Sequence, residues 1–274
     1  MVRAIIPAAG VGKRMGEGIP KPFLQIGGRP IVAHTLDVFE RCDSVDEVIL
    51  VVGMGDLQVC AEEIVDRYGF AKVRKIISGG KERQDSVWEG LKTVEGDTEI
   101  VVIHDGVRPF VDPKHLSESI ERCQECGAVI AAVPVKDTIK EAEDGADTHH
   151  PLVIGTLDRK RLWAIQTPQT FAFDLILQAY QRAMEAHITA TDDAALVERL
   201  GHPVRILRGS YRNIKITTPE DLALGEMILS QMCTAKLSLS EAEGTQRTQR
   251  KPTGKVLKCS ALSAPLSCIS CISW

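Results

Sequence analysis

Short apolar runs alternate with amphipathic stretches along about the first 230 residues. Residues 48–52 and 100–103 are uninterrupted runs of aliphatic, mostly β-branched residues, a pattern typical of buried parallel strands. Residues 31–39 and 82–94 carry apolar side chains at helical spacing instead. The alternation predicts an α/β fold with a doubly wound, mostly parallel sheet, in which ligands bind beyond the carboxyl ends of the strands. Further strands are predicted at 4–7, 73–77 and 128–133, with helix N-caps at Asp112 and Thr218.

Two segments interrupt the alternation. Residues 136 to about 163 contain no helical pattern, but a turn at His149-His150-Pro151 precedes the β-leaning run Leu152-Val153-Ile154. This pattern predicts a hairpin, or arm, that leaves the sheet. Residues 234–274 are aperiodic, and their six Lys and Arg residues stand against two Glu residues. We therefore expect a single folded domain over 1–233 that carries the arm, followed by a disordered basic tail.

The length, composition and charge of the chain exclude or disfavour several classes of protein. The chain has 274 residues, of which 44% are hydrophobic and 26% charged, which excludes disorder over the whole chain. The net charge of −4 disfavours nucleic acids and membrane surfaces as partners. No apolar run reaches the roughly 18 residues that a membrane span needs. The first residues enter a strand pattern at once, which predicts that there is no signal peptide.

The eight cysteines invite a metal or disulfide interpretation. Cys123 and Cys126 form one C-x-x-C pair, and Cys268 and Cys271 form another. The two pairs lie far outside the usual spacing of zinc sites, and no paired histidine motif accompanies them. We expect reduced thiols and a cytoplasmic location.

The strongest chemical signal follows the first strand, where residues 8–15 read Ala-Ala-Gly-Val-Gly-Lys-Arg-Met. A glycine-rich turn at this place lets backbone N–H groups approach phosphate oxygens, although it could also simply make a tight turn. A dinucleotide site is disfavoured, because Met15 stands where its pattern needs a third glycine. Arg14 and Lys21 bracket the turn, and two cations there would neutralise a triphosphate and stabilise charge in a transition state.

Two further motifs stand at predicted strand ends. Residues 79–86 read Gly-Gly-Lys-Glu-Arg-Gln-Asp-Ser and open a helix, so their amides and the Ser86 hydroxyl could bind a base or ribose. Ser86 could equally be a helix cap. Asp105, at the end of a buried strand, is a natural Mg²⁺ ligand, and the nearby Arg108 favours that role over a loop cap. His104 is interpreted as structural.

Together the motifs resemble the 2-C-methylerythritol 4-phosphate cytidylyltransferase family of the non-mevalonate isoprenoid pathway. The resemblance spans about residues 2–232 and rests on five separated motifs in the family's order. It implies a Rossmann-like nucleotidyltransferase sheet with a protruding β-arm, a homodimer formed through that arm, and Mg²⁺ and CTP as cofactor and co-substrate. The motifs are AAGVGKRM with PK, GGKERQDS, HDGVRP, PVKDT through DR and TPQ, and NIKITTPEDL.

The resemblance also implies residue roles. Arg14 and Lys21 would stabilise the transition state, while Arg159 and Lys215 would position the sugar phosphate. Asp105 would hold the metal. Thr138 and Arg159 would reach across into the partner's site. The residues expected around the nucleotide are Ala8, Ala9, Gly10, Gly12, Gly80, Ser86, Arg108 and Thr138. Lys81 stands where some relatives carry an acidic residue, but the backbone makes the expected contact there.

Three other functions compete with this interpretation. A ribitol 5-phosphate cytidylyltransferase would share most of the motifs. A dinucleotide-dependent oxidoreductase is disfavoured by Met15. A non-catalytic nucleotide-binding module is disfavoured because Arg14, Lys21 and Asp105 occur together.

Overall fold

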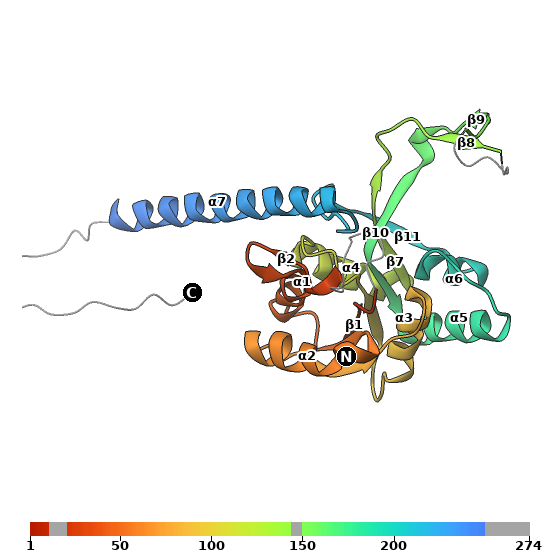
Figure 1. Ribbon diagram of the computed structural model, residues 1–274, viewed down its shortest axis with the longest axis horizontal. Helices are drawn as coiled ribbons and strands as arrows, with labels where there is room; N and C mark the ends of the chain where they lie inside the picture. The colour runs from red at the N-terminus through yellow and green to blue at the C-terminus, as the bar shows by residue number, and fades with distance from the viewer. Residues whose placement is uncertain (11–20, 144–149, 250–274) are drawn as a thin grey trace, which may run out of the picture. The chain divides into compact units, whose positions relative to one another are not determined.

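The computed structural model describes residues 1–10, 21–143 and 150–249, and it centres on a seven-stranded sheet in the order β11-β7-β10-β6-β1-β4-β5 (Figure 1). All neighbouring strands run parallel except β10, which is antiparallel to both β6 and β7. The predicted mostly parallel α/β sheet is thus confirmed, while the reversed strand was not predicted. The strands are β1 (Val2–Pro7), β4 (Glu47–Val52), β5 (Val73–Ser78), β6 (Ile100–Ile103), β7 (Ala128–Pro134), β10 (Trp163–Ala172) and β11 (Arg205–Arg208).

Helices cover both faces of the sheet. Along β1 the side chains alternate, so that Ala4 and Ile6 pack into one buried cluster with α1, α2 and α4, and Ile5 packs into another with α3, α5 and α6. No helix within the described residues is long and apolar enough to cross a membrane. The helices are α1 (Ile31–Glu40), α2 (Leu57–Cys60), α3 (Arg83–Lys92), α4 (Pro113–Cys126), α5 (Phe173–Glu185), α6 (Asp193–Arg199) and α7 (Pro219–Gln249), and a π-helical segment Ala61–Asp66 follows α2.

Both predicted helix N-caps are confirmed. The Asp112 carboxylate accepts a hydrogen bond from the Lys114 amide at 2.9 Å, ahead of the proline that opens α4. At the start of α7, the Asp221 amide donates to Thr218 Oγ1 at 3.3 Å, and the Asp221 carboxylate accepts from the Thr218 amide at 2.9 Å. This reciprocal pair satisfies amide groups that have no partner inside the helix.

The predicted arm is a hairpin. Strand β8 (Lys140–Ala142) pairs antiparallel with β9 (Val153–Thr156), and the chain then enters β10. Figure 1 shows this hairpin well away from the central sheet, beyond the start of β10. The apolar side chains of β9 have no core to enter: Val153 is 53% exposed and Ile154 is 54% exposed. Of the predicted turn, His149 lies outside the described residues.

The prediction of an irregular tail from residue 234 is wrong for its first part, because α7 continues to Gln249. Residues 234–249 lack an amphipathic period, but ten of these sixteen residues are the strong helix formers Ala, Leu, Glu, Gln, Lys and Arg, and the chain reaches no proline before Pro252. Intrinsic helix propensity therefore accounts for a helix that periodicity does not reveal. The chain divides into two compact units, Met1–Ser230 and Gln231–Trp274. The predicted disorder of residues 250–274 falls outside the described residues.

A third buried cluster supports the segment that carries Lys215. Ile216 packs with Ile26, Phe110 and Ile228, so the first turns of α7 are part of the core. The contact between α7 and the hairpin of β2 (Gln25–Ile26) and β3 (Arg29–Pro30) is close, because a Cβ on Gly27 would lie 2.5 Å from Leu229 Cδ2. Gly27 also has a φ of +57°, which favours glycine.

We expect the boundary of the folded unit to lie just beyond Ile228. Because Ile228 is 5% exposed, Ile228→Ala should lower the free energy of unfolding by about 2–5 kcal/mol, measured by urea denaturation. Residues 231–234 are exposed, so ending the chain after Met232 should leave the unfolding free energy nearly unchanged. A large loss on truncation would show that the C-terminal segment packs on the body.

Candidate active site

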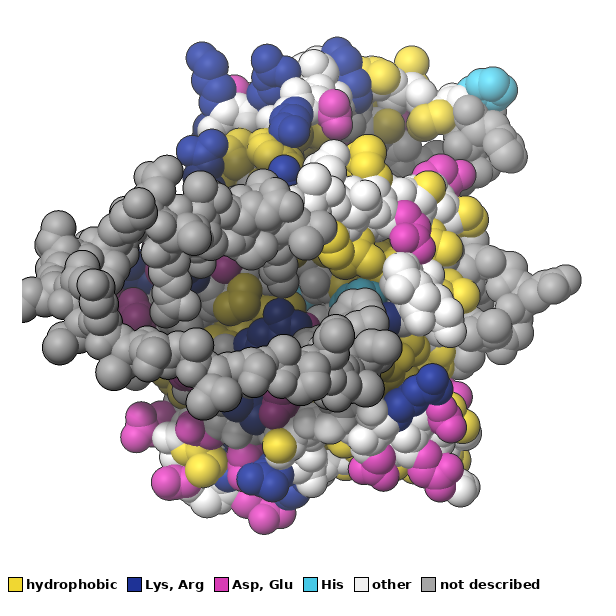
Figure 2. All heavy atoms as spheres, turned by 90° about the vertical axis from the view of Figure 1, so that its left-hand side faces the viewer, with side chains coloured by type: hydrophobic (Ala, Val, Ile, Leu, Met, Phe, Trp, Pro, Cys, Tyr) yellow, Lys and Arg dark blue, Asp and Glu magenta, His cyan; other side chains and the backbone are white. Residues whose placement is uncertain are grey.

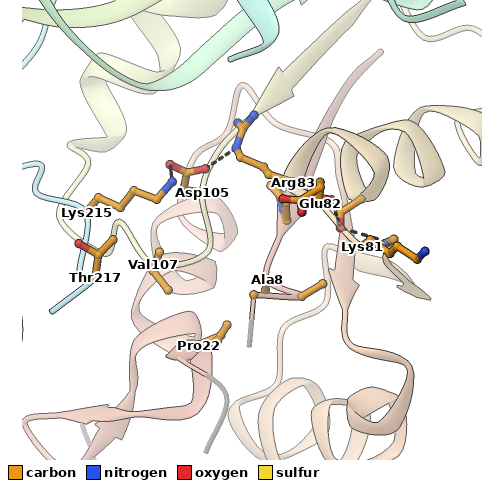
Figure 3. A pocket seen from close by; sticks show the side chains of 14 residues that line it. Ala8, Pro22, Lys81, Glu82, Arg83, Asp105, Val107, Lys215 and Thr217 are labelled. Atoms are coloured by element: carbon orange, nitrogen blue, oxygen red, sulfur yellow. Dashed lines mark hydrogen bonds and ion pairs between the residues drawn. The ribbon is translucent and has the colours of Figure 1, made fainter. Parts of the chain in front are cut away.

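A cavity of about 420 Å³ opens where β1, β5 and β6 end, at the carboxyl edge of the sheet (Figure 3). The segments that follow these three strands supply most of its walls, and the segment before α7 supplies the rest. This is the place at which parallel α/β sheets bind ligands. The cavity is lined by Pro7, Ala8, Ala9, Gly10, Pro22, Gly80, Lys81, Glu82, Arg83, Ser86, Asp105, Val107, Lys215 and Thr217.

The structure brings together seven of the residues that the sequence predicts for the site, namely Ala8, Ala9, Gly10, Gly80, Ser86, Asp105 and Lys215. Gly12 and Arg14 lie outside the described residues, and Lys21 is described only as the backbone start of a short 3-10 helix, Lys21–Phe23. Arg108 lies beside Asp105 but is not among the described lining residues. Thr138 and Arg159 are exposed on the arm and do not line the cavity in the described part of their own chain.

The turn after β5 packs closely on the turn after β1. A Cβ on Gly79 would lie 2.8 Å from Ala9 Cβ and 2.6 Å from Ser86 Oγ, so glycine is required for this approach. Ser86 Oγ accepts from the Gly80 amide at 3.2 Å and donates to the Glu82 carbonyl at 3.1 Å. The N-cap of α3 is Glu82 and not Ser86, which instead stabilises the turn from within the first turn of the helix and also lines the cavity.

Asp105 is a buried carboxylate surrounded by three cations. Arg83 Nε lies 2.8 Å from Oδ1, and Lys215 Nζ and Arg108 Nε lie 3.0 and 3.2 Å from Oδ2. Burial alone would raise the pKa of Asp105, but the charges of Arg83, Lys215 and Arg108 outweigh it and hold the pKa well below its usual range. Asp105 is therefore ionised, and it cannot serve as a base near neutral pH.

His104 lies behind this carboxylate in a chain of hydrogen bonds. Its Nε2–H donates to the Arg108 carbonyl at 3.0 Å, which leaves Nδ1 to accept from Thr167 Oγ1 at 3.1 Å. Thr167 Oγ1 in turn accepts from the Asp105 amide at 3.1 Å. The tautomer is assigned from this network. Burial lowers the pKa of His104 to about 4, so the ring is neutral and structural, as interpreted from the sequence.

Sequence reasoning missed Arg83 and its partner Asp193. The Arg83 guanidinium donates to both Asp193 oxygens, at 3.0 and 2.8 Å, in addition to Asp105. Arg83 stands within the motif of residues 79–86, but Asp193 lies in none of the five motifs, and 110 positions separate the two residues along the chain. Because no local pattern links them, only the fold shows that they form a pair.

The side chains at the cavity that could bind a metal suit an ion that is bound to a phosphate ligand better than an ion that the protein holds by itself. No group of three His, Cys, Asp or Glu side chains that could hold a metal ion occurs in the described part of the chain. Asp105 offers hard oxygen donors, but three cations already surround it. Mg²⁺ commonly combines one or two carboxylates with phosphate oxygens and water. Phosphate oxygens would therefore have to supply most of its ligands here.

Comparisons with known proteins agree with this geometry. The model of the family 2-C-methyl-D-erythritol 4-phosphate cytidylyltransferase matches residues 2–231. The enzyme of that name from Alkaliphilus oremlandii is 53% identical over 225 residues, which cover 82% of this chain and 93% of the relative. Its namesake from Geobacter metallireducens is 47% identical over 233 residues, with 84% and 98% covered. The crystal structure of 4-diphosphocytidyl-2C-methyl-D-erythritol synthase from Anaerococcus prevotii superposes with a TM-score of 0.73 at 35% identity, covering 84% of this chain and 96% of that one.

The neutral His104 predicts a pH dependence of stability. Its pKa is about 4 when folded and about 6.5 when unfolded, so the unfolded chain binds the proton more readily and stability falls as the pH drops below about 6.5. Between pH 7 and pH 5 protonation of this histidine alone should lower the free energy of unfolding by about 2 kcal/mol. Urea denaturation at both pH values should show that His104→Gln, which cannot titrate, loses less stability than the parent chain over this interval. Equal losses would contradict the assignment.

Proposed function

The chain belongs to the 2-C-methyl-D-erythritol 4-phosphate cytidylyltransferase family, and we propose that it transfers the cytidylyl group of CTP to 2-C-methyl-D-erythritol 4-phosphate. The products would be 4-diphosphocytidyl-2-C-methylerythritol and pyrophosphate. One observation carries the proposal: the two glycine turns, Asp105 and Lys215 meet around a single cavity at the strand ends.

The reaction needs no general base. A phosphate monoester has its second pKa near ~6, so the acceptor phosphate is largely a dianion at neutral pH and is already nucleophilic. One of its oxygens forms a bond to the α-phosphorus of CTP, while the bond from that phosphorus to the bridging oxygen breaks and pyrophosphate leaves. The low pKa of Asp105 suits this chemistry, since the reaction asks the carboxylate to hold charge and not to accept a proton.

The barrier in this reaction is the repulsion between two anions. Lys215 faces the cavity from the segment before α7 and would position the acceptor phosphate. We propose that Arg14 and Lys21 stabilise the transition state, because they stand in the motifs that resemble those of the family. Magnesium bound to the triphosphate would supply further positive charge, and Asp105 is the residue that we propose to hold it.

The nucleoside would occupy the side of the cavity formed by the two turns. Ala8 and Ala9 follow β1, while Gly80 lies in the turn before α3 and Ser86 in the first turn of that helix. Small side chains on both turns leave backbone atoms close to the cavity, which suits a flat pyrimidine. Gly10 and Gly12 would then lie nearer the phosphates. Arg108 would act through its ion pair with Asp105.

We further propose a homodimer in which the arm completes the partner's site. The arm exposes Leu152 (66%) together with Val153 and Ile154, and a second copy could bury this apolar run. The exposed basic residues of the arm are Lys136, Lys140, Arg159, Lys160 and Arg161. Figure 2 shows Lys and Arg side chains gathered at the top of the molecule, where Figure 1 places the arm. Their charge would attract an acceptor phosphate, and Thr138 and Arg159 would contact it.

A cytoplasmic location is part of the proposal. The cysteines of the described part of the chain, Cys42, Cys60, Cys123, Cys126 and Cys233, are free thiols, which suits a reducing compartment. The remaining three lie outside the described residues. The other acceptor considered from the sequence, ribitol 5-phosphate, is not favoured, because both relatives described above are named for the methylerythritol substrate.

The proposed reaction predicts a specific release of pyrophosphate. The purified chain with CTP and Mg²⁺ should release pyrophosphate when 2-C-methyl-D-erythritol 4-phosphate is added, and much less with ribitol 5-phosphate. Chelation of Mg²⁺ with EDTA should abolish the release, and excess Mg²⁺ should restore it. Faster release with ribitol 5-phosphate would contradict the proposed acceptor, and full activity in EDTA would contradict the proposed requirement for Mg²⁺.

The shared site predicts complementation between inactive chains. Arg159→Ala and Lys21→Ala homodimers should both be inactive in pyrophosphate release. When the two are mixed under conditions that exchange subunits, a heterodimer holds one site with both residues intact, so activity should return. Mass spectrometry of differently tagged chains confirms that heterodimers have formed. If they form and no activity returns, Arg159 acts within its own subunit.

A further inference from the structure

Arg83 joins the two walls of the cavity. It is the first residue of α3, directly after the glycine turn, while Asp105 follows β6 on the other side (Figure 3). Its Nε donates to Asp105 at 2.8 Å, and its two terminal nitrogens donate to both oxygens of Asp193. A planar guanidinium that donates in this way fixes both carboxylates relative to its own plane.

Asp193 is itself held firmly and lies out of reach of any ligand. It is 1% exposed, and it does not line the cavity as the described residues define it. The Tyr180 hydroxyl donates to its Oδ1 at 2.5 Å. Asp193 begins α6, whose N-cap residue Asp192 accepts from the side chain of Gln169 on β10 at 2.8 Å. The carboxylate is thus an anchor fixed by several elements.

A second pair of hydrogen bonds also links the start of α3 to the region of α6. Gln84, the next residue of α3, donates to the Ile188 carbonyl at 2.8 Å and accepts from the Ala190 amide at 2.8 Å. Two adjacent residues therefore hold the start of α3: Arg83 bonds to the first residue of α6, and Gln84 bonds to the segment before that helix. Because the glycine turn runs directly into α3, this fastening also sets where the turn lies.

We propose that Arg83 and Asp193 form a positioning pair, which fixes Asp105 relative to the nucleoside-binding turn at residues 79–82. The inference rests on the proposed function, in which the turn binds the nucleoside and Asp105 stands at the phosphates. Asp193 contacts no substrate, so its effect on the reaction passes through Arg83. The chemistry depends on the distance between these two parts of the cavity, because the α-phosphorus must be placed in line with its attacker and its leaving group.

Kinetics of Asp193→Asn test the proposal. This substitution keeps the size of the side chain but replaces one acceptor oxygen with a donor, so that the two parallel hydrogen bonds to Arg83 cannot both form. We expect kcat for pyrophosphate release to fall by about 10- to 100-fold, as for a displaced catalytic group, while KM for CTP changes by less than about threefold. Assays run well below the melting temperature, with circular dichroism to confirm folding.

Tyr180→Phe is the matched control, because it removes the other hydrogen bond to the same carboxylate and leaves the Arg83 contact intact. It should destabilise the protein but keep kcat near that of the parent. Arg83→Lys is a second test variant: a single ammonium lacks the fork for Asp193, so kcat should again fall with little change in KM.

The outcomes separate cleanly. If Asp193→Asn and Arg83→Lys fold and keep kcat within twofold of the parent, or if Tyr180→Phe loses as much activity as they do, the pair is only structural and the inference is wrong. An inactive parent chain would instead refute the proposed function.

Discussion

The buried carboxylate of Asp105 is the constraint around which the site is arranged. An ionised group at 5% exposure is tolerated only when charged partners and hydrogen bonds replace the water that it loses. Its partners come from α3, from its own loop and from the segment before α7, so one charge requires three distant parts of the chain to converge. The carboxyl edge of the sheet is where the fold lets them meet.

The convergence depends on packing beneath the cavity. The Ile216 amide donates to the Val107 carbonyl at 3.0 Å, which joins the segment of Lys215 to the loop of Asp105. Thr35, on α1, donates to the Gly106 carbonyl at 3.0 Å from below. Ile216 then packs against Ile228 of α7 in the third buried cluster. The hydrophobic core thus sets the geometry of the charged groups, since the polar contacts alone could form in other arrangements.

The sequence predicted those parts of the molecule that local patterns encode. Unbroken aliphatic runs identify β4 and β6, and the position of Asp105 directly after β6 places it at the ligand-binding edge. The pairing of Arg83 with Asp193 could not be predicted, because 110 residues separate two ordinary charges. Strand β10 runs antiparallel because the arm leaves the sheet where β7 ends and returns the chain at the same edge, so that Trp163 pairs with Pro134; no local pattern shows this. Residues 234–249 were misread because helix propensity without periodicity leaves no apolar stripe.

The described residues that face the cavity carry too little positive charge to balance the substrates. CTP and a phosphate monoester together carry about six negative charges near neutral pH. The described cations that line the cavity are Lys81, Arg83 and Lys215, but Arg83 pairs with Asp105 and Asp193, and Lys215 also pairs with Asp105. Two lysines cannot offset so much charge. This deficit is why the proposed function includes cations beyond the described residues, namely Arg14, Lys21, a metal ion carried by the triphosphate and the basic arm of a second subunit.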